Sequence, residues 1–184
     1  KDVVVIDVDE EGRAEPVVLA DRTSGKSSLF VLNVGAASSA EPAQVELPTS
    51  ATLVRLAGGV LDTKSTPSLV ALEEGGYADF AADTLWFFGL RDGKLAGLGS
   101  QDVAKDVVDV YLGDTDSDDR PELMLLEKSG IEVYPVQNET TLGTPFKTSL
   151  TASSSPTRLA MADLDGDSPA GMLVGKPETV PGPV

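Results

Sequence analysis

The sequence contains no cysteine and no histidine among its 184 residues. Without cysteine, the chain has neither a disulfide framework nor a thiolate metal site. Without histidine, it has no imidazole general base, no Ser-His-Asp triad and no histidine-ligated zinc site of its own. We therefore expect that the chain is not an enzyme, and that any metal it holds is bound by oxygen ligands.

Basic residues are also few, because 14 lysines and arginines stand against 30 acids, for a formal net charge of -16. Nucleic acids and anionic membrane surfaces both need a basic face, so neither is an expected partner. No apolar run approaches the roughly 20 residues of a membrane span, so membrane insertion is not expected. The acidic excess is compatible with bound divalent cations that cancel part of the charge.

One short segment combines clustered acids with an apolar run. Acids occupy its first, third, fifth and ninth positions, which are Asp114, Asp116, Asp118 and Glu122, and Leu123 to Leu126 follow at once. Neighbouring carboxylates repel one another unless a cation lies between them, and calcium accepts six to eight oxygen ligands. The apolar run is typical of a short buried strand. The segment therefore predicts a calcium loop that leads into a strand.

The acidic segment recurs along the chain at nearly constant spacing. The same four positions are Asp7, Asp9, Glu11 and Glu15 near the N-terminus; near the C-terminus they are Asp163, Asp165, Asp167 and Gly171. A degenerate copy that starts at Val60 keeps the apolar run but only one of the four acids, Asp62, because Val60, Lys64 and Ser68 replace the other three. Starting points at 7, 60, 114 and 163 give steps of 53, 54 and 49 residues, which are typical of propeller blades and similar arrays. We number these loops one to four and expect loop two to be free of metal.

Strand signals recur with the same period, and no segment has a sustained helical period. The predicted strands are 3–7, 16–21, 29–34 and 44–47; 52–56, 68–72, 84–90 and 94–98; 107–112, 122–127, 130–136 and 145–150; and finally 157–162 and 171–175. The sequence thus predicts an all-β chain that forms one β-propeller segment of four-stranded antiparallel blades. The expected blades are about 1–50, 51–99, 102–151 and a partial 155–176, with a tail at 177–184.

The order of acidic loop, apolar strand and a further strand such as Ile131-Glu132-Val133-Tyr134 resembles the FG-GAP/VCBS repeats. This family comprises the calcium-loop propeller repeats of integrin α-subunit heads and of many bacterial surface proteins. Loops one and three match its pattern well, loop four fairly and loop two poorly. The departures are Glu at the ninth position of loops one and three, and Asp119 where the family prefers glycine. The Phe-Gly and Gly-Ala-Pro signatures are absent, so the VCBS branch is the better match.

The resemblance implies that these loops join the first and second strands of a blade and bind structural Ca²⁺. A backbone carbonyl at the seventh position adds to the carboxylates, from Arg13 in loop one, Arg120 in loop three and Pro169 in loop four. We expect two Ca²⁺ ions, in loops one and three, and leave a third ion in loop four open. The alternative is an acidic surface turn, because Asp, Gly and Ser favour turns without any metal. Recurrence of the loops before an apolar strand favours the metal.

Aromatic residues are scarce, and Trp86-Phe87-Phe88 is their only cluster. On a strand, Trp86 and Phe88 share one face and Phe87 takes the other, so we expect them to pack between blades. A carbohydrate-stacking platform at Trp86 is the alternative. The segment 75–80, which contains Tyr77, is an insertion relative to the third repeat. It is either a binding loop or a tolerated surface loop.

Three and a half blades do not close a ring. We therefore expect either the remaining blades of a larger propeller, with six to eight in total, or a second chain; two such halves would give a seven-bladed ring. By resemblance, the predicted function is a secreted or surface-exposed module for protein interaction, adhesion or assembly. It would lie outside the cell, at the cell surface or in the periplasm, and bind a protein or a cell-surface component. The alternatives are a glycan-binding lectin and the accessory propeller of a secreted hydrolase.

Overall fold

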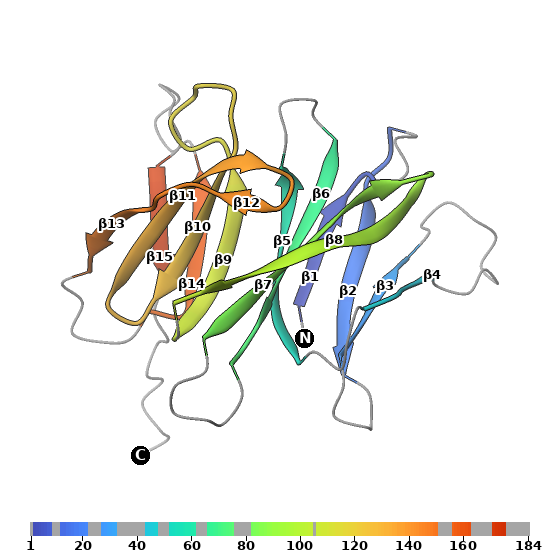
Figure 1. Cartoon of the computed structure of the whole chain (residues 1–184), viewed down its shortest axis with the longest axis horizontal. Coiled ribbons are helices and arrows are strands. Elements are labelled where there is room, and N and C mark those ends of the chain that lie inside the picture. The colour runs from blue at the N-terminus through green and yellow to red at the C-terminus, as the bar shows by residue number, and fades with distance from the viewer. Residues whose placement is uncertain are drawn as a thin grey trace, which may run out of the picture.

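The structure is a computed structural model that describes residues 2–8, 12–21, 27–32, 43–47, 52–61, 66–75, 82–104, 106–150, 156–162 and 171–175. These residues form β-strands joined by turns and loops (Figure 1). No helix is present among them, and hence none that is long and apolar enough to cross a membrane. The prediction of an all-β chain is confirmed.

The strands form four antiparallel sheets. Sheet one contains β1 (Asp2–Ile6), β2 (Glu15–Asp21), β3 (Ser27–Val31) and β4 (Ala43–Val45), and sheet two contains β5 (Leu53–Val60), β6 (Pro67–Glu73), β7 (Asp83–Arg91) and β8 (Lys94–Val103). Sheet three contains β9 (Val107–Gly113), β10 (Glu122–Glu127) and β11 (Gly130–Asn138), and both β12 (Thr141–Leu142) and β13 (Phe146–Ser149) pair with β11. Sheet four contains β14 (Arg158–Ala162) and β15 (Gly171–Gly175).

Each strand that the sequence predicts has a counterpart in these sheets. The main differences are that β5 continues to Val60 and β8 to Val103, and that β12 was not predicted because two residues carry no periodic signal. Asp92 and Gly93 form the turn of the hairpin between β7 and β8, with φ angles of 54° and 71°. Such left-handed pairs match the twist of the strands that they join.

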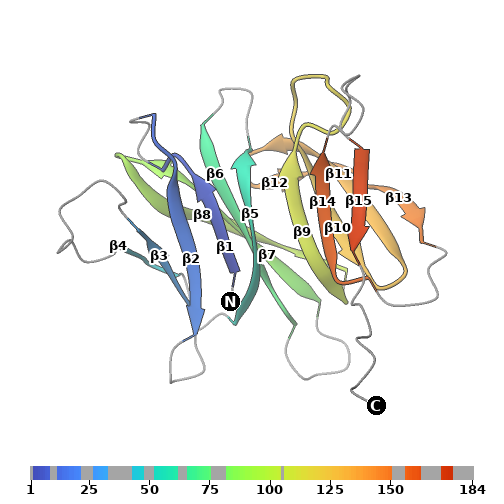
Figure 2. The same cartoon turned by 180° about the vertical axis from the view of Figure 1, so that it is seen from behind.

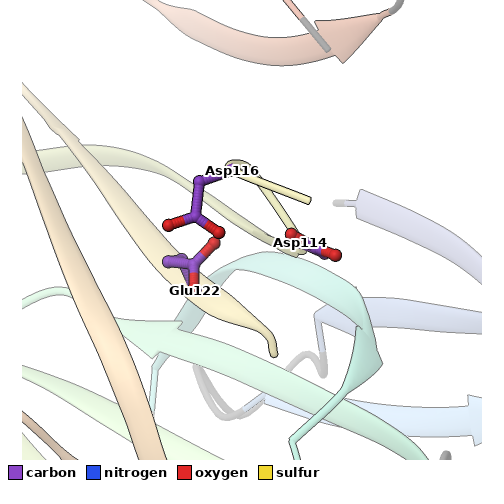
Figure 3. Close-up of side chains that lie close together, drawn as sticks. All are labelled: Asp114, Asp116 and Glu122. Carbon is purple, nitrogen blue, oxygen red and sulfur yellow. The ribbon is translucent and has the colours of Figure 1, made fainter. Parts of the chain in front are cut away.

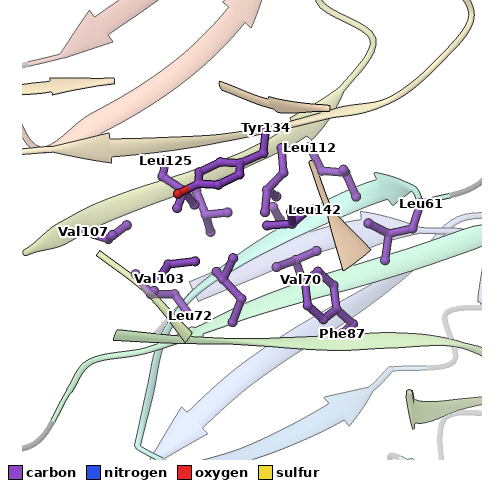
Figure 4. Close-up of a cluster of buried hydrophobic side chains, with 14 residues drawn as sticks. Leu61, Val70, Leu72, Phe87, Val103, Val107, Leu112, Leu125, Tyr134 and Leu142 are labelled. Atoms are coloured by element: carbon purple, nitrogen blue, oxygen red, sulfur yellow. The ribbon is translucent and has the colours of Figure 1, made fainter. Parts of the chain in front are cut away.

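Apolar side chains fill the space between successive sheets. One cluster lies between sheets one and two, a second between sheets two and three (Figure 4), and a third between sheets three and four. Phe87 belongs to the second cluster, whereas Phe88 and the partly buried Trp86 belong to the first. The prediction that Phe87 faces away from its two aromatic neighbours is confirmed.

The second strands of sheets two and three are buried on both faces. Leu69 to Leu72 in β6 and Leu123 to Leu126 in β10 are each 0% exposed. A strand that alternates sides can be apolar at every position only if both faces of its sheet are covered. The apolar run after loop three is therefore a buried strand, as predicted.

The first strands of the four sheets lie side by side in chain order, β1, β5, β9 and β14, with β5 in contact with both β1 and β9 (Figure 2). Two glycines in β5 allow this close approach. A Cβ added at Gly58 would lie 2.4 Å from Cγ2 of Ile6, and one at Gly59 would lie 3.0 Å from Cγ of Leu112. We infer that side chains at these two positions would force the first strands apart.

The first and second strands of all four sheets pair in the same register relative to the start of the acidic loop. In each sheet, the residue four before the start of the acidic loop pairs with the residue eleven after it. The four pairs are Val3 with Val18, Leu56 with Ala71, Val110 with Leu125, and Leu159 with Val174. The same positions of the repeat thus recur at the same height in all four sheets.

The residues five before each loop, which we call the pre-loop residues, alternate in charge: Asp2, Arg55, Asp109 and Arg158. The two aspartates bind the next sheet, because Asp2 accepts a hydrogen bond from Leu56 N at 3.1 Å and Asp109 accepts one from Leu159 N at 2.8 Å. The arginines connect them: Asp109 lies 3.5 Å from Arg55 and 3.7 Å from Arg158, which is also 3.7 Å from Asp2. The pre-loop residues thus link all four first strands.

Asp109 is the centre of this network and is only 3% exposed. Burial raises the pKa of its carboxyl, although the hydrogen bond from Leu159 N and the two arginines oppose the shift. We expect Asp109→Ala to lower the free energy of unfolding by about 2–4 kcal/mol, because two arginines lose their counter-charge and Leu159 N loses its acceptor. Urea denaturation measures this difference, and a loss below about 0.5 kcal/mol would contradict the role of Asp109.

Asp109→Asn provides a matched comparison, because the amide oxygen still accepts the hydrogen bond from Leu159 N. We expect it to cost less than the alanine variant. Since the folded pKa of Asp109 is raised, its contribution to stability is greatest below the unfolded pKa and is lost as the pH rises through the folded value. The wild type should therefore lose stability relative to Asp109→Asn over that pH range.

Candidate metal centre

Loop three joins β9 to β10 and brings three carboxylates together. One oxygen from each of Asp114, Asp116 and Glu122 lies within 4.8 Å of the others. Figure 3 shows the carboxylates of Asp116 and Glu122 turned toward each other, with Asp114 beside them. Asp114 directly follows β9 and Glu122 is the first residue of β10, so the sheet fixes both ends of the group. The sequence prediction grouped these three residues with Asp118 and Arg120, and the structure places the three together.

Hydrogen bonds within the loop hold two of these carboxylates in place. Asp114 accepts from Ser117 N at 2.7 Å and from Asp119 N at 3.0 Å. Glu122 Oε2 accepts from Thr115 N at 2.8 Å and from the Thr115 hydroxyl at 2.7 Å. Each carboxylate oxygen has two lone pairs, so the single hydrogen bond to each oxygen of Asp114 leaves room for a cation, and both bonds to Glu122 fall on Oε2 rather than Oε1. The loop backbone therefore orients the carboxylates before any ion arrives.

Glu122 is the most buried of the three acids in this group, at 8% exposed, and therefore the one that most needs a counter-charge. Burial raises the pKa of its carboxyl, the negative charges of Asp116 and Asp118 raise it further, and the two hydrogen bonds from Thr115 oppose the shift. The ionised form of Glu122 is thus disfavoured where it lies. A divalent cation among the three carboxylates would reverse this balance.

Asp118 and Arg120, the other two predicted ligands, lie in the exposed part of loop three. Asp118 Oδ1 accepts a hydrogen bond from Arg120 N at 2.9 Å, and Asp116 Oδ1 accepts one from Asp118 N at 3.2 Å. Asp118 does not belong to the group of carboxylates described above. In this conformation its side chain supports the turn of the loop.

Loop one, between β1 and β2, repeats two of the hydrogen bonds of loop three. Glu15 accepts from Val8 N at 3.0 Å, as Glu122 accepts from Thr115 N. Asp7 Oδ2 accepts from Gly12 N at 2.8 Å, as Asp114 Oδ2 accepts from Asp119 N. In both loops, therefore, the acid at position one accepts from the amide at position six, and the acid at position nine accepts from the amide at position two.

The backbone at position six is also alike in the two loops. Gly12 has a φ angle of 80° and Asp119 one of 64°, so both residues lie in the left-handed region. Glycine adopts this conformation without strain, whereas aspartate does so at a modest cost. Asp119 therefore adopts the backbone conformation of the glycine that the resemblance predicts, although its side chain makes this conformation less favourable.

The first acid of loop one has an oxygen without a partner. Asp7 Oδ1 is buried and accepts no hydrogen bond from the part of the chain that the structure describes. A buried carboxylate oxygen without a partner is costly, and a cation bound there would satisfy it. At the other end of the loop, Glu15 is 8% exposed, like Glu122. Arg13, whose carbonyl is the predicted ligand, lies in the exposed part of the loop.

The remaining predicted metal ligands lie outside the described residues. These are Asp9 and Glu11 in loop one, and Asp163, Asp165 and Asp167 in loop four. In loop two, the described residue at position nine is Ser68, which is 2% exposed and donates its hydroxyl to the carbonyl of Thr66 at 3.0 Å. A hydroxyl used in this way supplies no charge to a metal.

The structure describes only one of the two residues considered for ligand binding, Trp86 and Tyr77. Trp86 is partly buried against the cluster between sheets one and two, and its indole nitrogen donates to Glu73 at 2.7 Å. It thus packs between sheets, as the first of the two interpretations expects. Tyr77 lies outside the described residues.

Sequence reasoning missed Thr115, whose amide and hydroxyl both bind Glu122. A hydroxyl at position two of an acidic loop was the available signal. It also missed the alternation of the pre-loop residues, which is visible in the sequence once the phase of the repeat is known. Comparison of the chain with family models and with curated proteins gives no match.

Replacement of Asp119 by glycine tests the conformation of loop three. We expect Asp119→Gly to raise the free energy of unfolding by up to about 1 kcal/mol, because glycine removes the strain of a positive φ angle. The matched control is Asp119→Ala, which removes the same charge but keeps a Cβ, and it should be no more stable than the wild type. Equal gains in both variants in urea denaturation would assign the effect to charge instead.

Glu122→Gln tests the electrostatics of the buried acid. In a chelator at neutral pH, we expect this variant to be at least as stable as the wild type, because it removes a disfavoured ionised group while its amide oxygen still accepts from Thr115. The difference should shrink as the pH falls, since the raised pKa makes the wild-type contribution greatest when Glu122 is protonated. Glu46→Gln, at an exposed acid, is the control. A metal-free Glu122→Gln protein that is more than about 1 kcal/mol less stable than the wild type would contradict this interpretation.

Proposed function

We propose that this chain is a calcium-stabilised β-propeller segment of the FG-GAP/VCBS type, and that it acts as a non-catalytic interaction, adhesion or assembly module outside the cell. The observation that carries the proposal is the recurrence of one loop geometry. Loops one and three have the same two hydrogen bonds between acids and amides, and each precedes the second strand of its sheet. Acidic surface turns that arose independently would not be expected to share these contacts.

Support for propeller blades comes from the stacking of the sheets. Sheets one and two each run in the order first to fourth strand, and sheet three begins in the same way with β9, β10 and β11. The first strands meet in chain order, and the pairing register keeps the phase of the repeat. Blades of a propeller contact only their neighbours and place their first strands around a common axis. We interpret the four sheets as three blades and the beginning of a fourth.

Support for calcium comes from the chemistry of the ligands. The group in loop three offers only oxygen atoms, and carboxylate oxygens are the ligands of a hard cation such as Ca²⁺. Extracellular modules bind Ca²⁺ with dissociation constants of about 10⁻⁴–10⁻³ M, so a site of this kind suits a secreted or surface-exposed protein. The carboxylates that would hold the ion are not left available to act on a substrate.

The proposed partner is a protein or a cell-surface component that contacts the loops between strands. Loops carry binding functions on rigid scaffolds, and the net charge of -16 disfavours nucleic acid. We rank a glycan-binding lectin lower, because Trp86 is packed between sheets and donates its indole N–H to Glu73. The accessory propeller of a hydrolase is compatible with the same fold, and no contact among the residues that the structure describes favours it.

Calcium removal tests this proposal. We expect saturating Ca²⁺ to stabilise the folded chain by about 2.7 kcal/mol for each site filled at 100 times its Kd. For a chain of this size, this corresponds to roughly 5–10 °C in Tm per site. The measurement is thermal unfolding in excess EGTA and in about 10–100 mM CaCl₂, which is 100 times the dissociation constants given above.

A loop variant and a matched control make the test specific. Asp114→Asn should lose a large part of the calcium-dependent rise in Tm, because it removes a charge from the group in loop three. Asp92→Asn makes the same change in the hairpin between β7 and β8, outside the acidic loops, at a left-handed position that Asn tolerates, and should keep the full rise. Identical wild-type melting curves in EGTA and CaCl₂ would disprove the proposal.

A further inference from the structure

Sheet one has an apolar face that no described sheet covers. Val3 and Val5 in β1 are 56% and 61% exposed and lie on the same side of the strand. Val3 pairs with Val18, which in turn pairs with Phe30, so these three side chains form a row across the sheet. This is the face turned away from sheet two, since Val4, Ile6 and Val17 belong to the cluster between the two sheets.

The equivalent positions in the other sheets are buried against the preceding sheet. Val3 corresponds in phase to Leu56, Val110 and Leu159, which are 5%, 5% and 8% exposed. Val5 corresponds to Leu112, which is 3% exposed. Sheet one thus carries apolar residues at the positions that, in the other three sheets, pack against the preceding sheet. We infer that the face with Val3, Val5, Val18 and Phe30, which we call the leading face, is a docking surface for such a sheet.

A complementary face lies on sheet four, at the other end of the row of sheets (Figure 2). Leu173 in β15 is 43% exposed, whereas its equivalents Val17, Val70 and Met124 are each 0% exposed beneath the following sheet. We call the side of sheet four that carries Leu173 the trailing face. The chain thus exposes both halves of the contact that joins its own sheets.

The charges of the pre-loop residues match across the same junction. Where sheet two meets sheet three, Arg55 lies 3.5 Å from Asp109 of the following sheet. The pre-loop residue of sheet four is again an arginine, Arg158, whose side chain is 54% exposed and lies 3.7 Å from Asp109 and from Asp2, the pre-loop residue of sheet one, within the same chain. A copy of sheet one placed after sheet four would bring a further Asp2 to Arg158 and continue the alternation of Asp and Arg.

We propose that the partner of the leading face is a second copy of this chain, docked head to tail, with the trailing face of each copy on the leading face of the other. This arrangement rests on the proposed propeller and gives it a two-fold ring in which both uncovered faces are buried. Head-to-tail contacts form closed rings only when the rotation between copies closes, and otherwise they form open filaments. The net charge of each copy opposes association, so salt should promote it.

Sedimentation of the whole chain tests the proposal. At tens of micromolar protein and moderate salt, with calcium present, we expect a species of twice the 19.1 kDa monomer mass, which is 38.2 kDa. Val5→Glu places a charge on the leading face and should give monomers. Thr141→Glu adds the same charge at an exposed strand position of sheet three and should remain dimeric. A wild type that stays monomeric, or that forms open polymers, would overturn the proposal and assign the leading face to a different sheet.

Mixing two variants tests the pairing of the two faces. Val5→Glu keeps an intact trailing face and Leu173→Glu keeps an intact leading face, so each alone should be monomeric while an equimolar mixture forms heterodimers. A dimeric Leu173→Glu protein would show that two leading faces dock against each other, which would overturn the proposal. The calcium-dependent rise in Tm of the monomeric Val5→Glu variant reports on the metal sites alone, so a failed dimer and a failed calcium proposal are distinguishable.

Discussion

The structure depends on the need to cover both faces of each inner sheet. Strands such as β6 and β10 are apolar at successive positions, so each of their sheets must lie between two others. This requirement sets the order of the sheets and brings the first strands together, where Gly58 and Gly59 allow close contact. The buried Asp109 then connects β9 to β14 through its hydrogen bond with Leu159 N. Apolar packing provides the stability, and the polar contacts between first strands fix how neighbouring sheets align with one another.

The acidic loops follow from the same arrangement. Each joins a first strand to a second strand, so its last acid, Glu15 or Glu122, enters the sheet and is largely buried. Two unit charges 4 Å apart repel by about 1 kcal/mol in water and about 4 kcal/mol near a protein surface. Without a cation, this repulsion acts at the junction of the two inner strands. We infer that an ion in the loop would convert a local weakness of the sheet into a cross-link.

The sequence predicts the strands and the phase of the repeat, because apolar runs and turn residues act locally. It also groups Asp114, Asp116 and Glu122, since nine residues of one loop cannot separate far. It does not predict the contact between Asp109 and Leu159, which are 50 residues apart, because no local pattern encodes contacts between sheets. For the same reason, the packing of Trp86 and the supporting role of Asp118 become apparent only from the folded chain.

The central claim is that the acidic loops hold calcium at the junction of the first two strands of a sheet. An anomalous difference map from a crystal grown in CaCl₂ tests it most directly. We expect a peak in loop three with oxygens of Asp114, Asp116 and Glu122 at about 2.3–2.6 Å, and a second in loop one beside Asp7 and Glu15. A well-ordered loop three without a peak, or with Glu122 turned away from it, would contradict the claim.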